Sequence, residues 1–243
     1  MSADHATAYD GVRRRVGELA QIGPDRPVPA TPGWTVRNLV AHLAGLAADW
    51  VAGRLEAYAS AGWTASQVEE RKLTPLQGLL DDWGASARTM EGILTDPAGS
   101  GLPDPLMTAF GPVASAAWPD LIVTDAAMHE HDIRGAVGEP GARTSNALQL
   151  AMRSHVGLLR FVAGAYSLPP LELQPSDGDR VYRVGRDEPQ VLLRASLFEL
   201  FRATGGRRSL RQIAAMDWFG DPGEWARHIV MPSYTAPEAD LVE

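Results

Sequence analysis

Apolar side chains recur at helical spacing in five segments of the first two-thirds of the chain, and this pattern limits the fold more than any other feature. The second segment shows it most clearly, because Leu39, Leu43 and Leu46 would share one face of a helix. Thr35 stands directly before this segment and is well suited to cap a helix N-terminus. The expected helices cover residues 6–21, 36–58, 75–94, 113–137 and 146–166. Helices with such apolar faces are expected to pack as a bundle.

The pattern changes after Leu168, which is followed by two prolines. Short segments with alternating or β-branched residues then stand between turn signals, and this indicates strands. The sequence predicts strands in LELQ, DRVYRVG and PQVLLRAS, and helices in ASLFELFRAT and SLRQIAAM. The tail MPSYTAPEADLVE is expected to be loose. The predicted fold class is therefore α+β, with a helical bundle over residues 1–168 and a small C-terminal α/β domain over residues 169–243.

The charge balance argues against nucleic-acid binding. The formal net charge is −8, and no block rich in lysine and arginine could neutralise phosphates. The 243 residues include no cysteine, which excludes disulfides, a cysteine nucleophile and thiolate metal ligands. The N-terminus lacks the apolar core of a signal peptide, and no apolar run reaches the roughly 18 residues of a membrane span. We therefore expect a cytoplasmic protein with neither nucleic acid nor membrane as a partner.

A polar cluster in the segment TDAAMHEHDIRGAVG, residues 124–138, is the first candidate for a functional site. Asp125 and His129 are four residues apart, so a helix would place them on one face, one turn apart. Apolar residues share that face, which should therefore be buried. A buried carboxylate and a buried imidazole are costly unless something neutralises them. Glu130 and His131 fall off this face and are expected at the surface.

His42 is the best candidate for a third partner of this pair. It lies between Leu39 and Leu43, on the buried side of its predicted helix. Two helices of one bundle can bring His42 to face Asp125 and His129. Two imidazoles and one carboxylate suit a divalent first-row metal, and three protein ligands leave positions open for water or substrate. From spacing alone, histidines that are hydrogen-bonded in the core remain an alternative.

Three longer segments extend this picture. GWTVRNLVAHLAGL, TDAAMHEHDIRGAVG and GGRRSLRQIAAMDWFGDP follow one another along the chain. Together they resemble the mycothiol-dependent maleylpyruvate isomerase family, and the order of the three is more specific than any one of them. The resemblance covers most of the chain. It implies a DinB-like four-helix bundle followed, as in many members, by a small C-terminal α/β domain.

The resemblance also implies a divalent metal, usually zinc, held by His42, Asp125 and His129. The family has glutamate where this chain has Asp125, whose side chain is one methylene shorter. Asp132 matches an aspartate of the family and is expected to support the site rather than to bind the metal. His131 stands where the family often has tryptophan, and this difference bears on the substrate.

Arg207, in the segment GGRRS, is the candidate catalytic and cofactor-binding residue. In the family the C-terminal domain helps to bind the thiol and carries a functional arginine, and Arg207 is the better match. We expect it to hold an acidic group of the thiol or of the substrate through charge-assisted hydrogen bonds. The alternative is a solvated turn with two basic residues.

The resemblance implies thiol chemistry at the metal. Coordination lowers the pKa of a thiol, usually mycothiol in this family, and the thiolate attacks an electrophilic carbon. An isomerase then releases the thiol, whereas a thiol S-transferase leaves it on the product. Two alternatives stay open: a non-catalytic small-molecule-binding or regulatory protein, and a metal-dependent hydrolase, with Asp49 or Asp132 tested as its base. The expected partners are the thiol and a small electrophile, with the protein a monomer or homodimer.

Overall fold

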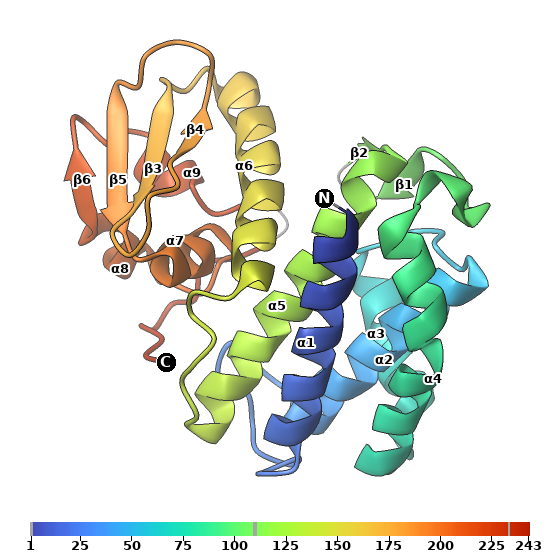
Figure 1. Ribbon diagram of the computed structural model, residues 1–243. Coiled ribbons are helices and arrows are strands. Elements are labelled where there is room, and N and C mark those ends of the chain that lie inside the picture. Colours follow the sequence, from blue (N-terminus) through green and yellow to red (C-terminus); the bar gives the residue numbers. More distant parts are fainter. Residues whose placement is uncertain (1, 109–110, 233) are drawn as a thin grey trace. The chain divides into compact units, whose positions relative to one another are not determined.

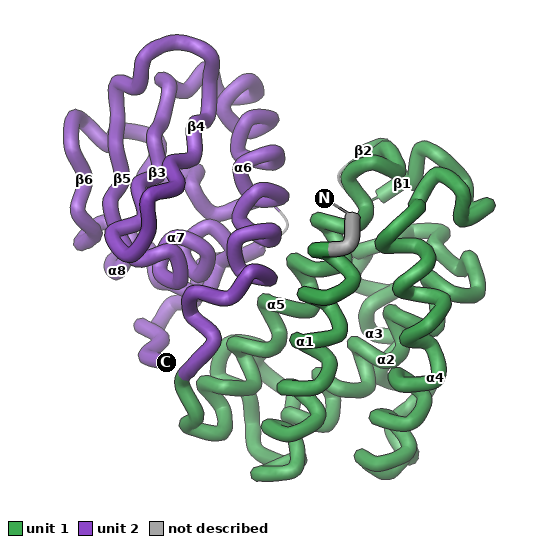
Figure 2. Tube along the Cα trace, viewed as in Figure 1, with its two compact units in different colours: residues 1–140 green, residues 141–243 purple. Residues whose placement is uncertain are grey.

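The computed structural model describes residues 2–108, 111–232 and 234–243. The chain forms two compact units, Met1–Pro140 and Gly141–Glu243, which Figure 2 shows in green and purple. This division precedes the helix at residues 146–166, whereas the sequence indicates a boundary after residue 168. The difference arises because that helix packs against the strands and helices that follow it. Among the described residues, no helix combines the length and the apolar character that crossing a membrane requires.

The first unit contains the expected four-helix bundle (Figure 1). Its helices are α1 (Ser2–Ala20), α2 (Val36–Ala52), α4 (Leu76–Thr95) and α5 (Trp118–Val137). Helices α1 and α2 each pack against both α4 and α5. The apolar faces meet in a core that includes Leu39, Leu43 and Leu79. Thr35 caps α2 as expected, because its side chain accepts a hydrogen bond from the backbone amide of Asn38.

Helix α2 is shorter than the sequence indicates, and a further helix follows it. It ends at Ala52 rather than near Tyr58, because Gly53 adopts a left-handed conformation (φ 69°) that closes the helix. Helix α3 (Ala61–Arg71) was not expected. Its one buried residue is Gln67, so no apolar periodicity marks this segment as a helix.

Helix α5 begins at Trp118 rather than near Val113. The preceding chain forms the short helices η1 (Ala98–Ser100) and η2 (Ser115–Ala117) and a hairpin of β1 (Leu106–Thr108) and β2 (Gly111–Val113). Leu106 pairs with Val113 in this antiparallel hairpin. Each strand has three residues, too few for the alternating apolar pattern that reveals a strand in sequence.

Gly45 allows α3 to approach α2 closely. A Cβ atom at this position would lie 2.7 Å from Gln67 Cβ and 2.9 Å from Arg71 Nη1. We expect Gly45→Ala to lower the free energy of unfolding by about 1–3 kcal/mol, the usual cost of overpacking. Urea denaturation measures this change. Gly92→Ala is the control, because Gly92 is exposed in α4 with no atom near its Cβ position. Equal losses in both variants would contradict the expectation.

The second unit is the small α/β domain that the sequence indicates. Its strands are β3 (Leu171–Pro175), β4 (Tyr182–Val184), β5 (Val191–Ala195) and β6 (Asp217–Phe219), in the sheet order β4-β3-β5-β6. Its helices are α6 (Asn146–Tyr166), α7 (Leu197–Thr204), α8 (Leu210–Ala214) and α9 (Trp225–His228). Strands β3 and β5 are parallel, with Leu171 opposite Val191, and the other pairings are antiparallel. Helix α7 packs on β3 and β5, and α6 packs on α7 and β4.

The end of the C-terminal tail is held by ion pairs and hydrogen bonds of Asp240, Leu241 and Glu243, so the expectation of a loose tail is wrong for these residues. Glu243 receives hydrogen bonds from the buried guanidinium groups of Arg202 and Arg208, at 2.8 Å from Arg202 Nε and 2.9 Å from Arg208 Nη1. Residue 233 of the tail lies outside the described residues. A buried arginine is costly without an anionic partner, and this explains why an acidic residue of the tail is fixed.

His155 of α6 is enclosed in the core of the second unit. Its Nδ1 lies 2.6 Å from Thr204 Oγ1, and its ring stacks on Phe201 with 4.7 Å between the ring centres. Burial, and to a lesser degree the charge of Arg207, lower the pKa of His155 from its ordinary value of 6.5 to about 3. Between these pH values the unfolded chain binds a proton here that the folded chain does not.

Acid is therefore expected to destabilise the protein through His155. The free energy of unfolding should fall as pH falls from 6.5 toward 3, and this one group supplies up to about 1.4 kcal/mol per pH unit. His155→Gln removes the titration, so the stability difference between wild type and variant should shrink as the pH falls. Urea denaturation over a pH series measures that difference. If the difference in unfolding free energy between the two proteins stays constant with pH, His155 is not the group responsible for the acid sensitivity.

Candidate metal centre

The bundle brings together the three predicted ligands. His42 comes from α2, and Asp125 and His129 come from successive turns of α5. His42 Nε2 lies 3.3 Å from Asp125 Oδ2, and His129 Nε2 lies 3.7 Å from Asp125 Oδ1. The two imidazole rings meet edge to face with 5.0 Å between their centres. One ligand atom from each residue lies within 4.8 Å of the others, so a single ion can contact all three.

Each imidazole has a second partner on its far side. His42 Nδ1 lies 2.7 Å from Gln67 Oε1, and His129 Nδ1 lies 2.9 Å from Asp132 Oδ2. Asp132 is thus in the supporting place that the sequence indicated. Outer hydrogen bonds of this kind orient a metal-binding imidazole and raise its basicity. With both Nδ1 atoms occupied, the two Nε2 atoms are directed toward Asp125.

The site is buried at the histidines and partly open at the carboxylate. His42 and His129 are buried, whereas 26% of the Asp125 side chain is exposed. The ring of the half-buried Trp34 lies 5.6 Å from the ring of His42. Part of the Asp125 side chain is therefore exposed, while both imidazoles are buried.

The charge of Asp125 changes the protonation of His42. Burial acts to lower the pKa of His42, but Asp125, with smaller contributions from Gln67 and Asp49, outweighs burial and raises it. The carboxylate thus stabilises positive charge on the neighbouring His42 ring. A metal ion and a proton compete for the same Nε2 atom, so metal affinity is expected to fall as the pH decreases.

The donor set fits a divalent metal. Two imidazole nitrogens and a carboxylate oxygen are ligands that zinc takes in catalytic sites, where three protein ligands leave a position for substrate or water. A metal site also needs its ligands held in orientation, and the Nδ1 contacts of His42 with Gln67 and of His129 with Asp132 provide this. His42, Asp125 and His129 would hold such an ion.

Glu130 and His131 are buried, so the expectation that both lie at the surface is wrong. Glu130 is bound by Arg15 Nε of α1 at 2.7 Å and by Arg134 Nη2 at 2.9 Å. The expectation treated α5 as a helix with a single buried face. Helices α1, α2 and α4 all contact α5, and their packing covers more than that face.

Sequence reasoning missed Gln67, and it considered Asp49 only as a possible base. Gln67 Nε2 donates to Asp49 Oδ2 at 2.8 Å, and Asp49 Oδ1 pairs with Arg54 at 2.8 Å. Asp49 is thus engaged away from the space between the three ligands. The sequence around Gln67 is polar and carries no motif, so no signal in the sequence would have revealed its role.

Arg207 belongs to the second unit, between α7 and α8. Its side chain is buried, its Nη1 donates to the Gly205 carbonyl at 3.1 Å, and its guanidinium lies 5.5 Å from the Tyr234 ring centre. The adjacent Arg208 is engaged by Glu199 and Glu243. The alternative of a solvated turn is therefore wrong, because both arginines are buried.

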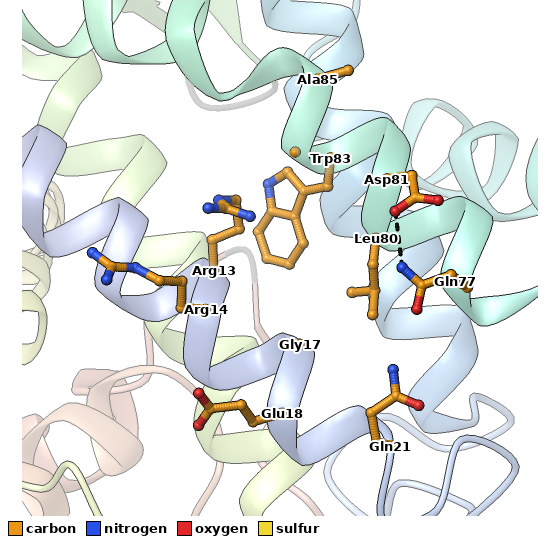
Figure 3. Close-up of a pocket in the computed structure, with 11 residues that line it drawn as sticks. Arg13, Arg14, Gly17, Glu18, Gln21, Gln77, Leu80, Asp81, Trp83 and Ala85 are labelled. Carbon is orange, nitrogen blue, oxygen red and sulfur yellow. Dashed lines mark hydrogen bonds between the residues drawn. The ribbon is translucent and has the colours of Figure 1, made fainter.

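The first unit also has a groove of about 690 Å³ between α1 and α4, which Figure 3 shows. Arg13, Arg14 and Glu18 line its α1 side, and Gln77 and Asp81 line its α4 side. The charges are mixed, and Arg13 and Arg14 both pair with Asp10. None of the three metal-ligand candidates lines this groove, so its size does not make it the functional site.

Comparison with known proteins places this arrangement in a family. The family model described as the mycothiol maleylpyruvate isomerase N-terminal domain matches residues 5–134, a range that includes His42, Asp125 and His129. A crystal structure of the mycothiol-dependent maleylpyruvate isomerase has a TM-score of 0.60 at 14% identity, over 85% of this chain and 90% of that one. A mutant of that enzyme, with a histidine replaced by alanine, has a TM-score of 0.60 at 13% identity, over 85% and 89%. No curated protein matches the chain. The match over more than half of its residues shows that the chain belongs to the mycothiol maleylpyruvate isomerase family.

Proposed function

We propose that the protein is a metal- and mycothiol-dependent enzyme that activates a low-molecular-weight thiol for addition to an electrophilic carbon. The observation that carries the proposal is the convergence of ligand atoms from His42, Asp125 and His129 within 4.8 Å of one another, with part of the Asp125 side chain exposed. The donor set favours zinc. Membership of the family supports mycothiol as the thiol.

The residues of the centre have two proposed roles, metal binding and positioning of the ligands. His42, Asp125 and His129 bind the ion, while Gln67 and Asp132 hold the two imidazoles in position. The ion, when bound, supplies a Lewis acid that lowers the pKa of a thiol so that the thiolate forms near neutral pH. The chain has no cysteine, so the reacting thiol comes from outside.

Arg207 is proposed to bind an acidic group of the thiol or of the substrate. The planar guanidinium can donate two parallel hydrogen bonds to one carboxylate, which fixes the orientation of the ligand. The adjacent Arg208 is engaged by Glu199 and Glu243. Arg207→Lys keeps the positive charge but loses the paired donors. We therefore expect this variant to have a higher KM, because the ligand is no longer held in one orientation.

The proposal is tested with zinc-loaded and metal-free protein, each assayed with mycothiol and with a second thiol, against a panel of electrophiles that includes maleylpyruvate. Turnover that needs both zinc and mycothiol supports the proposal. An isomerase regenerates the thiol, whereas an S-transferase consumes one thiol per product, so thiol consumption separates the two reactions. Turnover without any thiol would identify a hydrolase, and binding without turnover would identify a non-catalytic protein.

A further inference from the structure

Gln67 connects the metal centre to an acidic residue that does not belong to it. It is the one buried residue of α3 and is only 1% exposed. One end of its amide lies 2.7 Å from His42 Nδ1, and the other end donates to Asp49 Oδ2 at 2.8 Å. Asp49 is buried as well, and Arg54 Nη2 lies 2.8 Å from its second oxygen. The chain of contacts thus runs from Arg54 through Asp49 and Gln67 to His42.

The chemistry of these groups leaves one consistent set of donors and acceptors. An ionised carboxylate only accepts hydrogen bonds, so Asp49 must face the NH₂ group of Gln67. The carbonyl oxygen of Gln67 therefore faces His42, and it too can only accept. His42 Nδ1 must then carry the proton. In the neutral ring this leaves the lone pair on Nε2, the atom that faces Asp125 and the metal position.

We propose that Asp49 and Gln67 are positioning residues that select the metal-binding tautomer of His42. This inference rests on the proposed function, since a metal ion is what the Nε2 lone pair would bind. His129 needs no such intermediate, because Asp132 accepts directly from its Nδ1. The two imidazoles are thus oriented in different ways. Asp132 contacts His129 directly, whereas Asp49 acts on His42 through the amide of Gln67.

The close packing of α3 supports this role. Because Gly45 has no side chain, the helix that carries Gln67 can approach α2 to a distance that any Cβ would prevent. Otherwise α3 is a polar helix that adds no apolar side chain to the core. Its contribution to the buried part of the unit is the Gln67 amide.

We call the contacts from Asp49 through Gln67 to His42 the relay. Two single substitutions and their combination, which exchanges the amide and the carboxylate between positions 49 and 67, test it. The measured quantity is zinc affinity, determined at alkaline pH by competition with a chelator. Gln67→Glu places two carboxylates against each other, and Asp49→Asn leaves the Gln67 amide free to turn over. Each should weaken zinc binding about 10- to 100-fold, the usual effect of losing an outer partner of a ligand. The double variant restores a consistent set of donors and acceptors. The new amide at position 49 can donate a hydrogen bond to the new carboxylate at position 67, and that carboxylate can accept one from His42 Nδ1. It should recover most of the lost affinity.

Losses that add up in the double variant would overturn the proposal, because a merely structural role predicts two independent defects. Urea denaturation of all four proteins identifies any loss of affinity that comes from unfolding. Ring ¹⁵N NMR of the metal-free protein gives a separate readout. At an alkaline pH where the ring is neutral, wild-type His42 should carry its proton on Nδ1, with a mixture of tautomers in Asp49→Asn. A neutral wild-type ring with its proton on Nε2 instead would overturn the relay. Wild-type protein that binds no zinc but shows the Nδ1 tautomer would contradict the proposed function and leave the relay standing.

Discussion

His42→Ala is expected to weaken zinc affinity by more than about 100-fold, since losing the outer partner of a ligand already costs about 10- to 100-fold. The variant removes one of the two imidazoles and leaves His129 and Asp125 as an incomplete set. Competition with a chelator of known affinity measures the change. Thermal unfolding with and without zinc gives a second measure, because a ligand that binds only the folded chain raises its stability.

The matched control for this prediction is His228→Ala. His228 lies in the second unit, where its ring stacks on Tyr166, and it is outside the predicted ligand set. This variant should bind zinc as tightly as wild type. A His42→Ala protein that keeps wild-type zinc affinity, or a His228→Ala protein that loses it, would show that the metal binds elsewhere.

Asp125→Asn is expected to have an effect of similar size on metal binding and a further effect on protonation. The substitution removes the anionic ligand, so zinc affinity should fall by more than about 100-fold. It also removes the charge that raises the pKa of His42, so in the metal-free protein this pKa should fall. NMR titration of the histidine rings follows the pKa, and chelator competition follows the affinity.

Asp125→Glu separates charge from geometry at this position. Glutamate keeps the carboxylate and has the side-chain length that the family resemblance implies, so this variant should retain both zinc binding and the raised pKa of His42. Loss of zinc binding in Asp125→Glu would show that the shorter carboxylate of this chain is matched to its own site. An unchanged pKa of His42 in Asp125→Asn would contradict the assigned electrostatics.

The bundle was predictable because its helices carry long apolar periodicities. Leu39, Leu43 and Leu46 repeat on one face of α2, and tertiary packing buries that face. The segments that escaped prediction lack this signal. Helix α3 buries a glutamine instead of apolar side chains, and β1 and β2 are three-residue strands. Short polar elements are fixed by their contacts with the rest of the fold, which a local pattern does not contain.

The candidate ligands were predictable for a related reason. Asp125 and His129 are one helical turn apart, and His42 stands among leucines, so their placement follows from helix geometry. The hydrogen bond between His42 and Gln67 joins residues of two different helices. Such a contact depends on how α2 and α3 pack. The burial of Glu130 likewise depends on Arg15, which is distant in sequence.

The most direct test of the central claim is metal analysis of the wild-type protein, purified without added metal and without an affinity tag, followed by titration of the same protein with zinc. The three-ligand centre predicts about one divalent ion per chain, either retained through purification or taken up at one equivalent. Protein that contains no metal and takes up none on titration would contradict the metal centre and the thiol chemistry proposed for it.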